Sequence, residues 1–117
     1  MRLFVYGTLM PGQDRWPALR PFASAWQPAT AGGRLWDSGH GYPVARFGDG
    51  PPIPGFVVTV EADERARALT VLDRIEDEGS LFRRVEVVTS LGTATGYEWL
   101  GPTEGLAPLP GGWRPQS

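Results

Sequence analysis

One glutamate, Glu76, combines a position and a chemistry that set it apart from the other acidic residues. It follows an apolar pattern of helical spacing in which Leu69, Leu72 and Ile75 share one face. At about 100° per residue from Leu69, Glu76 falls near 340° and Leu72 near 300°, so Glu76 lies inside the apolar stripe. A carboxylate there faces the interior, where burial raises its pKa. The alternative is that the helix ends by Ile75 and that Glu76 is a solvated turn residue.

A second candidate for chemistry is the glycine-bounded loop Gly7-Thr8-Leu9-Met10-Pro11-Gly12. It follows residues 2–6, a run of aromatic and branched side chains that is typical of a buried strand. Glycine lets backbone N–H groups approach a ligand with no Cβ in the way, so such a loop can bind an anion such as a carboxylate. The alternative is an ordinary turn after a strand.

The acidic residues near Glu76 suggest one further chemistry. Asp73, Glu76 and Asp77 are spaced i, i+3 and i+4, so on a helix they share an edge and could hold Mg²⁺ for a hydrolase. Acidic runs at helix ends are more often solvated, and no phosphate-binding loop accompanies this one. We therefore expect no metal and no other cofactor, and the Mg²⁺ alternative predicts an activity that EDTA removes.

The composition excludes several classes of protein. The 117 residues show no shift of composition, so we expect a single domain over residues 1–117. Cysteine is absent, which excludes disulfides, iron–sulfur ligation and thiolate catalysis. The net charge of −2 predicts no nucleic-acid or anionic-membrane surface. The apolar run near residue 3 is too short for a signal peptide or membrane span, so we expect a cytoplasmic protein.

The elements that must position these residues are short, since the chain has 16 glycines and 12 prolines. Pro17 and Pro21 limit residues 13–27 to a short helix or 3₁₀ turn. The main helix is expected to begin at Ala62 or Asp63, with Asp63 as its N-cap, and to stop at Gly79. The expected strands are 2–6, 29–36, a short one ending near 45, 53–60, 82–89 and 93–100.

The remaining segments are expected to be irregular. Residues 47–54 are predicted to form a surface loop, and the tail from about Gly101 is predicted to lack regular structure, with Trp113 anchored to the body. Six short strands and one main helix predict an α+β domain whose small mixed sheet is strongly curved or barrel-like.

Several motifs occur along the chain in a fixed order. They are Val5-Tyr6-Gly7-Thr8-Leu9-Met10, Leu35-Trp36-Asp37 with Gly41-Tyr42-Pro43, Pro54-Gly55-Phe56, and Leu72-Asp73-Arg74-Ile75-Glu76 followed by Phe82-Arg83-Arg84-Val85. As a set, over about residues 3–100, they resemble the γ-glutamylcyclotransferase-like family, in its AIG2-like or γ-glutamylamine cyclotransferase branch.

The resemblance implies a barrel-like fold whose cavity is floored by the glycine loop and holds one essential glutamate. By position, the substrate-binding residues are Tyr6, Gly7, Thr8 and Leu9, and the catalytic acid/base is Glu76. The implied reaction is attack by the α-amine of a γ-glutamyl group on its own γ-carbonyl, which releases 5-oxoproline and an amine without a metal. Three features would raise the pKa of Glu76: its apolar face, the carboxylates of Asp73 and Asp77, and the negative end of the helix.

Two departures from the family pattern keep a second interpretation open. Phe82 stands where the family usually has tyrosine, and Asp77-Glu78 replace the glycine that commonly follows the glutamate. The alternative is a catalytically silent relative that binds a small acidic metabolite or a protein partner. The expected partner of an active protein is a small-molecule γ-glutamyl substrate, with the leaving amine left open. We expect a monomer or a weak homodimer.

Overall fold

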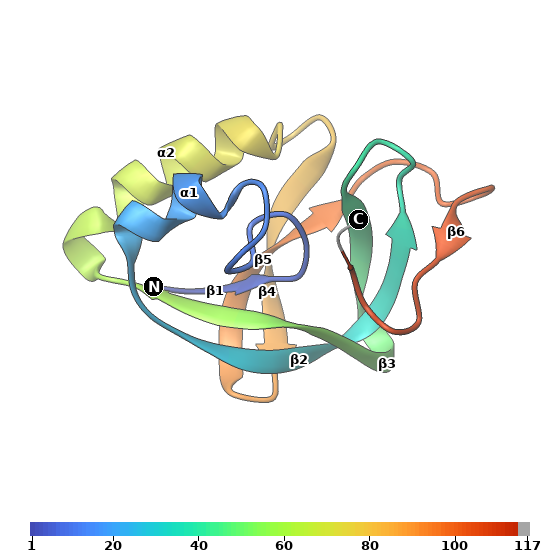
Figure 1. The fold of residues 1–117 in the computed structure, drawn as a ribbon, viewed down its shortest axis with the longest axis horizontal. Coiled ribbons are helices and arrows are strands. Elements are labelled where there is room, and N and C mark those ends of the chain that lie inside the picture. Colours follow the sequence, from blue (N-terminus) through green and yellow to red (C-terminus); the bar gives the residue numbers. More distant parts are fainter. Residues whose placement is uncertain (115–117) are drawn as a thin grey trace.

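A strongly curved sheet closes on itself in the computed structural model, which describes residues 1–114 (Figure 1). The strand order is β3-β1-β5-β4-β2, β2 pairs back onto β3, and β6 extends the other edge of β2. All pairings are antiparallel except that of β1 with β5. The strands are β1 Arg2–Val5, β2 Ala23–Asp37, β3 Pro43–Val60, β4 Phe82–Thr89, β5 Gly92–Trp99 and β6 Ala107–Pro108. The predicted α+β, barrel-like class is confirmed.

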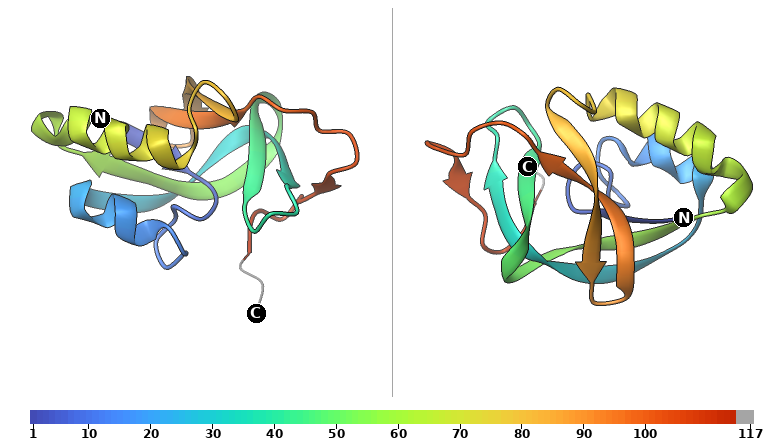
Figure 2. Two further views of the ribbon diagram at one scale, coloured as in Figure 1. Left: turned by 90° about the horizontal axis from the view of Figure 1, so that it is seen from above. Right: turned by 180° about the vertical axis from the view of Figure 1, so that it is seen from behind.

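Two helices lie side by side over one side of this sheet (Figures 1 and 2). Helix α1 spans Trp16–Leu19 and continues as the 3₁₀ turn η1, Arg20–Phe22, which agrees with the predicted short helix. Helix α2 spans Arg65–Ile75 and follows the 3₁₀ turn η2, Ala62–Glu64. The start of this helical segment is therefore as predicted.

The predicted N-cap and the predicted C-terminal end of the main helix need correction. Asp63 lies inside η2, and the N-cap of α2 is Glu64, which makes no side-chain capping hydrogen bond. The helix stops at Ile75 rather than at Gly79, because Asp77 adopts a left-handed backbone with φ of 50°. A left-handed residue cannot continue a right-handed helix.

The sequence prediction was least accurate for the two longest strands, β2 and β3, whose lengths it underestimated. Strand β2 starts six residues before the predicted strand, so Trp26 lies on a strand and is 36% exposed. Strand β3 runs through the segment 47–54 that was predicted to be a loop. That prediction was wrong because the β2–β3 pairing continues on both sides of a register shift, from Gly32↔Pro52 to Gly33↔Phe47, so that the segment forms a large bulge within the strand. Gly33 takes a φ of 151° there, a conformation that favours glycine.

Strand β1 is the centre of the hydrophobic core because both of its faces are buried. Leu3 and Val5 point into the cluster beneath the helices, whereas Phe4 and Tyr6 point into the cluster inside the barrel. Within the sheet, β1 is hydrogen-bonded between β3 and β5. The chain that leaves the end of β1 therefore starts from a rigid position between the two clusters.

The tail beyond Gly101 is largely irregular, as predicted, apart from the two residues of β6. Trp113 packs against both hydrophobic clusters, which confirms the predicted anchor. The last three residues of the tail lie outside the described residues. Within residues 1–114, no helix combines the length and apolar character needed to cross a bilayer.

Candidate active site

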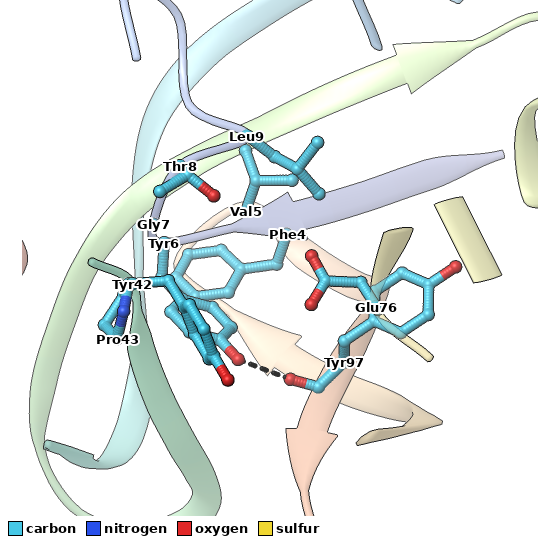
Figure 3. Close-up of a pocket in the computed structure, with 10 residues that line it drawn as sticks. All are labelled: Phe4, Val5, Tyr6, Gly7, Thr8, Leu9, Tyr42, Pro43, Glu76 and Tyr97. Carbon is cyan, nitrogen blue, oxygen red and sulfur yellow. Dashed lines mark hydrogen bonds between the residues drawn. The ribbon is translucent and has the colours of Figure 1, made fainter. Parts of the chain in front are cut away.

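A small pocket opens where β1 ends and the glycine loop begins (Figure 3). It brings together all five residues singled out by the sequence, Tyr6, Gly7, Thr8, Leu9 and Glu76. The cavity volume is about 30 Å³, which is enough for one ordered water. The other walls are Phe4, Val5, Tyr42, Pro43 and Tyr97. Loop and glutamate, about 70 residues apart in the chain, face one cavity.

Glu76 reaches this pocket because the helix ends just before it. Its backbone N–H still bonds to the carbonyl of Leu72 at 2.9 Å, and Asp77 then turns the chain away. The helix thus ends by Ile75, as the alternative interpretation had it, but Glu76 is not a solvated turn residue. Its side chain is half-buried, and its carboxylate points toward Phe4 and the glycine loop with Tyr97 beside it (Figure 3).

The environment changes the protonation of Glu76. Burial raises its pKa from an ordinary 4.5 to about 7, and the positive charge of Arg15 opposes part of this shift. Sequence reasoning had also assigned a share to Asp73 and Asp77, and that assignment was wrong. Asp73 is neutralised by Arg84 at 3.1 Å, and Asp77 is exposed in the turn. A carboxyl group with a pKa near neutrality can both accept and return a proton at physiological pH.

The glycine loop lines the pocket with residues whose backbone donors are not engaged. Its carbonyls are engaged, since Gly7 O accepts from Met10 N at 3.0 Å and Thr8 O accepts from Arg15 N at 2.8 Å. Among residues 1–114, the N–H groups of Gly7, Thr8 and Leu9 donate no hydrogen bond to the protein. Consecutive unpaired N–H groups beside a cavity are a favourable site for a carboxylate or an oxyanion.

Gly7 is needed because the loop passes close to Pro43. A Cβ at this position would lie 2.6 Å from Pro43 Cγ. We expect Gly7→Ala to lower the free energy of unfolding by about 1–3 kcal/mol through overpacking, and to displace the loop donors. Urea unfolding checks the first effect and ligand affinity the second. Gly111→Ala is the matched control, because its Cβ meets no described atom within 4 Å; an equal loss in both variants would contradict this account.

A chain of hydrogen bonds fastens the pocket to the end of α2. The Tyr6 hydroxyl donates to the backbone carbonyl of Tyr97 at 2.6 Å, as Figure 3 shows, and the Tyr97 hydroxyl donates to Asp73 Oδ1 at 2.7 Å. Arg84 completes the chain with its ion pair to Asp73. Burial raises the pKa of both tyrosines above its ordinary value, so both stay protonated donors.

Some pocket residues were missed by the sequence prediction. Tyr42 and Pro43 belong to the motif Gly41-Tyr42-Pro43, which could have pointed to the site. Tyr97 had no such signal, because a tyrosine in an alternating strand is usually a core residue.

The departures from the family pattern lie outside the pocket. Phe82 is 3% exposed and packs edge-on against Trp99 with ring centroids 5.3 Å apart, so it is a core residue and not a pocket wall. Asp77 and Glu78 are exposed in the turn. The left-handed backbone of Asp77 also explains why glycine suits the position after the glutamate.

The carboxylates of the Mg²⁺ alternative do not converge. Asp73 is held by Tyr97 and Arg84, Glu76 faces the pocket and Asp77 faces solvent. In the part of the chain that the structure describes, no three acidic, histidine or cysteine side chains form a group able to hold a metal ion. The shared helical edge expected from i, i+3 and i+4 spacing is lost because the helix ends at Ile75.

Comparison with known proteins identifies the family. The family model described as gamma-glutamyl cyclotransferase, AIG2-like, matches residues 3–115. A solved structure from Pyrococcus horikoshii is 25% identical, with a TM-score of 0.64, and the match covers 93% of this chain and 85% of that one. The YtfP protein of Escherichia coli is 27% identical, with a TM-score of 0.60 and coverages of 93% and 91%.

A third structure supports the fold alone. An AIG2-like protein of Mus musculus is 19% identical, with a TM-score of 0.64 and coverages of 93% and 85%. A comparison with curated proteins found no match. The family description indicates cyclotransferase-type chemistry. Since its model matches nearly the whole length, with the pocket residues inside the match, this chain belongs to the gamma-glutamyl cyclotransferase, AIG2-like family.

Proposed function

We propose that this protein is a γ-glutamyl cyclotransferase that releases 5-oxoproline and a free amine from a γ-glutamyl amine or peptide. The observation that carries the proposal is a single carboxyl group with a pKa of about 7, Glu76, in a pocket that is also lined by Gly7, Thr8 and Leu9, whose N–H groups donate no hydrogen bond within the described residues. These are the two requirements of an intramolecular acyl transfer, a proton carrier and an anion holder.

The loop orients the substrate in this proposal. Its N–H groups bind the α-carboxylate, so that the γ-glutamyl chain folds with its α-nitrogen against its own γ-carbonyl. Because the nucleophile is already tethered, orientation supplies much of the rate, with effective molarities up to about 10⁵–10⁸ M in favourable cases. No covalent enzyme intermediate is needed.

Glu76 moves the protons. Its carboxylate takes one proton from the α-ammonium, and the freed amine forms a C–N bond with the γ-carbonyl carbon. The protonated Glu76 then delivers this proton to the leaving nitrogen as the original amide bond breaks. The ring nitrogen loses a second proton by the same route. Both protons end on the leaving amine, and Glu76 returns to its starting state.

The pH dependence of the rate follows from the pKa of Glu76. The free enzyme must hold Glu76 deprotonated to accept the first proton, so we expect kcat/KM to fall about tenfold per pH unit below about pH 7. Steady-state assays between pH 4 and 9 check this. A profile that stays flat down to pH 5 would show that a group with an ordinary carboxyl pKa, or no carboxyl group, controls the reaction.

The direct test is release of 5-oxoproline from a panel of γ-glutamyl amino acids, peptides and alkylamines, measured by liquid chromatography and mass spectrometry. We expect turnover of at least one class, unchanged by EDTA. Calorimetry on the same panel separates the second candidate, a silent relative, which would bind members of the panel without turnover. The positions of Phe82, Asp77 and Glu78 outside the pocket favour the active form.

A further inference from the structure

Arg15 stands at the edge of the candidate site without belonging to it. Its backbone N–H is bonded to the carbonyl of Thr8, a pocket wall, at 2.8 Å. Its guanidinium lies over the ring of Tyr42, a second pocket wall, with Cζ 5.8 Å from the ring centroid. The side chain itself is exposed. Backbone and side chain thus tie this cation to two walls on the solvent side of the pocket.

Within the described residues, the charge of Arg15 has no partner. The arginines in ion pairs are Arg67 with Glu64, Arg83 with Glu98 and Arg84 with Asp73. Among residues 1–114, Arg15 makes no ion pair and its side chain donates no hydrogen bond. A guanidinium held on an aromatic face with its N–H fork free can bind a carboxylate with two parallel hydrogen bonds.

The proposed reaction leaves one part of the substrate unassigned. The α-carboxylate is bound by the N–H groups of the glycine loop, and the scissile amide lies beside Glu76. In the proposed pose, the leaving amine extends toward solvent, past Tyr42 and Arg15. An anion carried by this part of the substrate would meet the guanidinium that lies over the Tyr42 wall. The carboxylates of Asp14 and Asp37 line the neighbouring cavity beside Thr8, on another side of the loop from Tyr42.

We propose that Arg15 determines specificity by binding a carboxylate of the leaving amine, so that γ-glutamyl amino acids are preferred over γ-glutamyl alkylamines. This inference rests on the proposed function, since it concerns the same pocket. It names a substrate class, which the family relationship leaves open. A contact to a part of the substrate that does not react strengthens ground state and transition state alike, so the preference falls on KM and leaves kcat nearly unchanged.

Two substrates of the same shape test the preference. Alanine and isopropylamine differ as leaving groups by a carboxylate in place of a methyl group. We expect the wild type to show a KM for γ-glutamyl-alanine about fivefold lower than for γ-glutamyl-isopropylamide, the size expected of one exposed ion pair. The preference should shrink as salt is raised, because an exposed pair is screened. It should vanish in Arg15→Gln.

Arg20→Gln is a matched control. Arg20 is also exposed and also lies over an aromatic ring, with Cζ 4.9 Å from the Trp26 centroid, but Trp26 is not a wall of the pocket. We expect this variant to keep the fivefold preference and the wild-type kcat. If Arg15→Gln also keeps the preference, or if Arg20→Gln loses it equally, the specificity role of Arg15 is wrong.

A binding measurement separates this inference from the proposed function. In the Glu76→Gln background, which should bind without rapid turnover, calorimetry compares the two compounds with and without Arg15→Gln. Loss of the preference on removal of Arg15 supports the inference, whereas an unchanged preference overturns it and leaves the cyclotransferase intact. Failure of every γ-glutamyl compound to bind or react in the wild type overturns the proposed function and this inference together.

The pKa of Glu76 provides a second test, because it would not change if Arg15 had only a structural role. The titratable side chains that line the pocket with Glu76 are Tyr6, just after β1, Tyr42, just before β3, and Tyr97 from β5, which stays neutral and bonded to Asp73. Arg15, from the loop before α1, is the charged group that acts on Glu76. Only Arg15 lowers the pKa of Glu76. We expect Arg15→Gln to raise this pKa, seen by NMR of the side-chain carboxyl, and Arg20→Gln to leave it unchanged. An unmoved pKa in Arg15→Gln contradicts the placement of the guanidinium.

Discussion

Glu76→Gln is expected to slow the release of 5-oxoproline by about 10²–10⁴-fold, the usual contribution of a positioned general acid/base. Glutamine has nearly the same shape but can neither take a proton from the α-ammonium nor return one to the leaving nitrogen. Orientation by the glycine loop remains, so residual activity above the uncatalysed rate should persist. The effect should fall on kcat, because the proton is transferred in the transition state.

A neighbouring carboxylate provides the control for this experiment. Asp77→Asn makes the same carboxylate-to-amide change one residue further on, at an exposed position outside the pocket, and asparagine tolerates its left-handed backbone. We expect Asp77→Asn to keep wild-type kcat within about twofold. Full 5-oxoproline release by Glu76→Gln from a substrate that the wild type cleaves would remove Glu76 from the mechanism.

Glu76→Gln is also expected to stabilise the fold at high pH. The folded-state pKa of Glu76 is raised from 4.5 to about 7, so the folded protein binds this proton more tightly than the unfolded chain does. The contribution of this proton to the free energy of unfolding is therefore fully present below about pH 4.5 and is lost as pH rises through about 7. The shift of about 2.5 units corresponds to about 3 kcal/mol. Glu76→Gln avoids this cost because it carries no charge.

Urea unfolding at two pH values measures the effect without any substrate. We expect Glu76→Gln to exceed the wild type by up to about 3 kcal/mol at pH 8 and by less than about 1 kcal/mol at pH 5. Asp77→Asn should show no such growth with pH, because that carboxylate is exposed. Equal gains for Glu76→Gln at both pH values would mean that the carboxylate is not desolvated in the folded protein.

Together these two results would describe one trade-off. A carboxyl group that is costly to bury at pH 8 is retained at a position where an uncharged residue would be more stable. Destabilising groups of this kind persist where activity requires them. Lost activity with gained stability in one variant is difficult to produce by general misfolding, which lowers both.

The local elements that carry the site could be predicted from the sequence, because their signals are local. Strand β1 follows from an uninterrupted run of apolar residues, the body of α2 from the spacing of Leu69 and Leu72, and the loop from its glycines. The association of Tyr6–Leu9 with Glu76 came from the resemblance to the cyclotransferase family, which rests on the order of the motifs along the chain. The half-exposed strands β4 and β5 were also predicted within one residue of their bounds, since their sequences mix core and solvent-facing side chains.

The tertiary structure decided what depends on distant segments. Strands β2 and β3 are long because they pair with each other across a bulge, and no local pattern in residues 24–28 or 47–54 favours a strand. Tyr97 is a pocket wall because β5 pairs with β1. Arg15 lies at the rim of the pocket because its guanidinium packs over the ring of Tyr42.

The charge state of Glu76 is another property that depends on distant segments. Helical spacing placed its carboxylate on an apolar face, which is a local property, and the sequence determined that much. Its pKa of about 7 depends on the atoms that exclude water from it and on one guanidinium. These atoms come from β1, the glycine loop, residue 42 and β5, and only folding brings them together, because desolvation sums over neighbours in space and not along the chain.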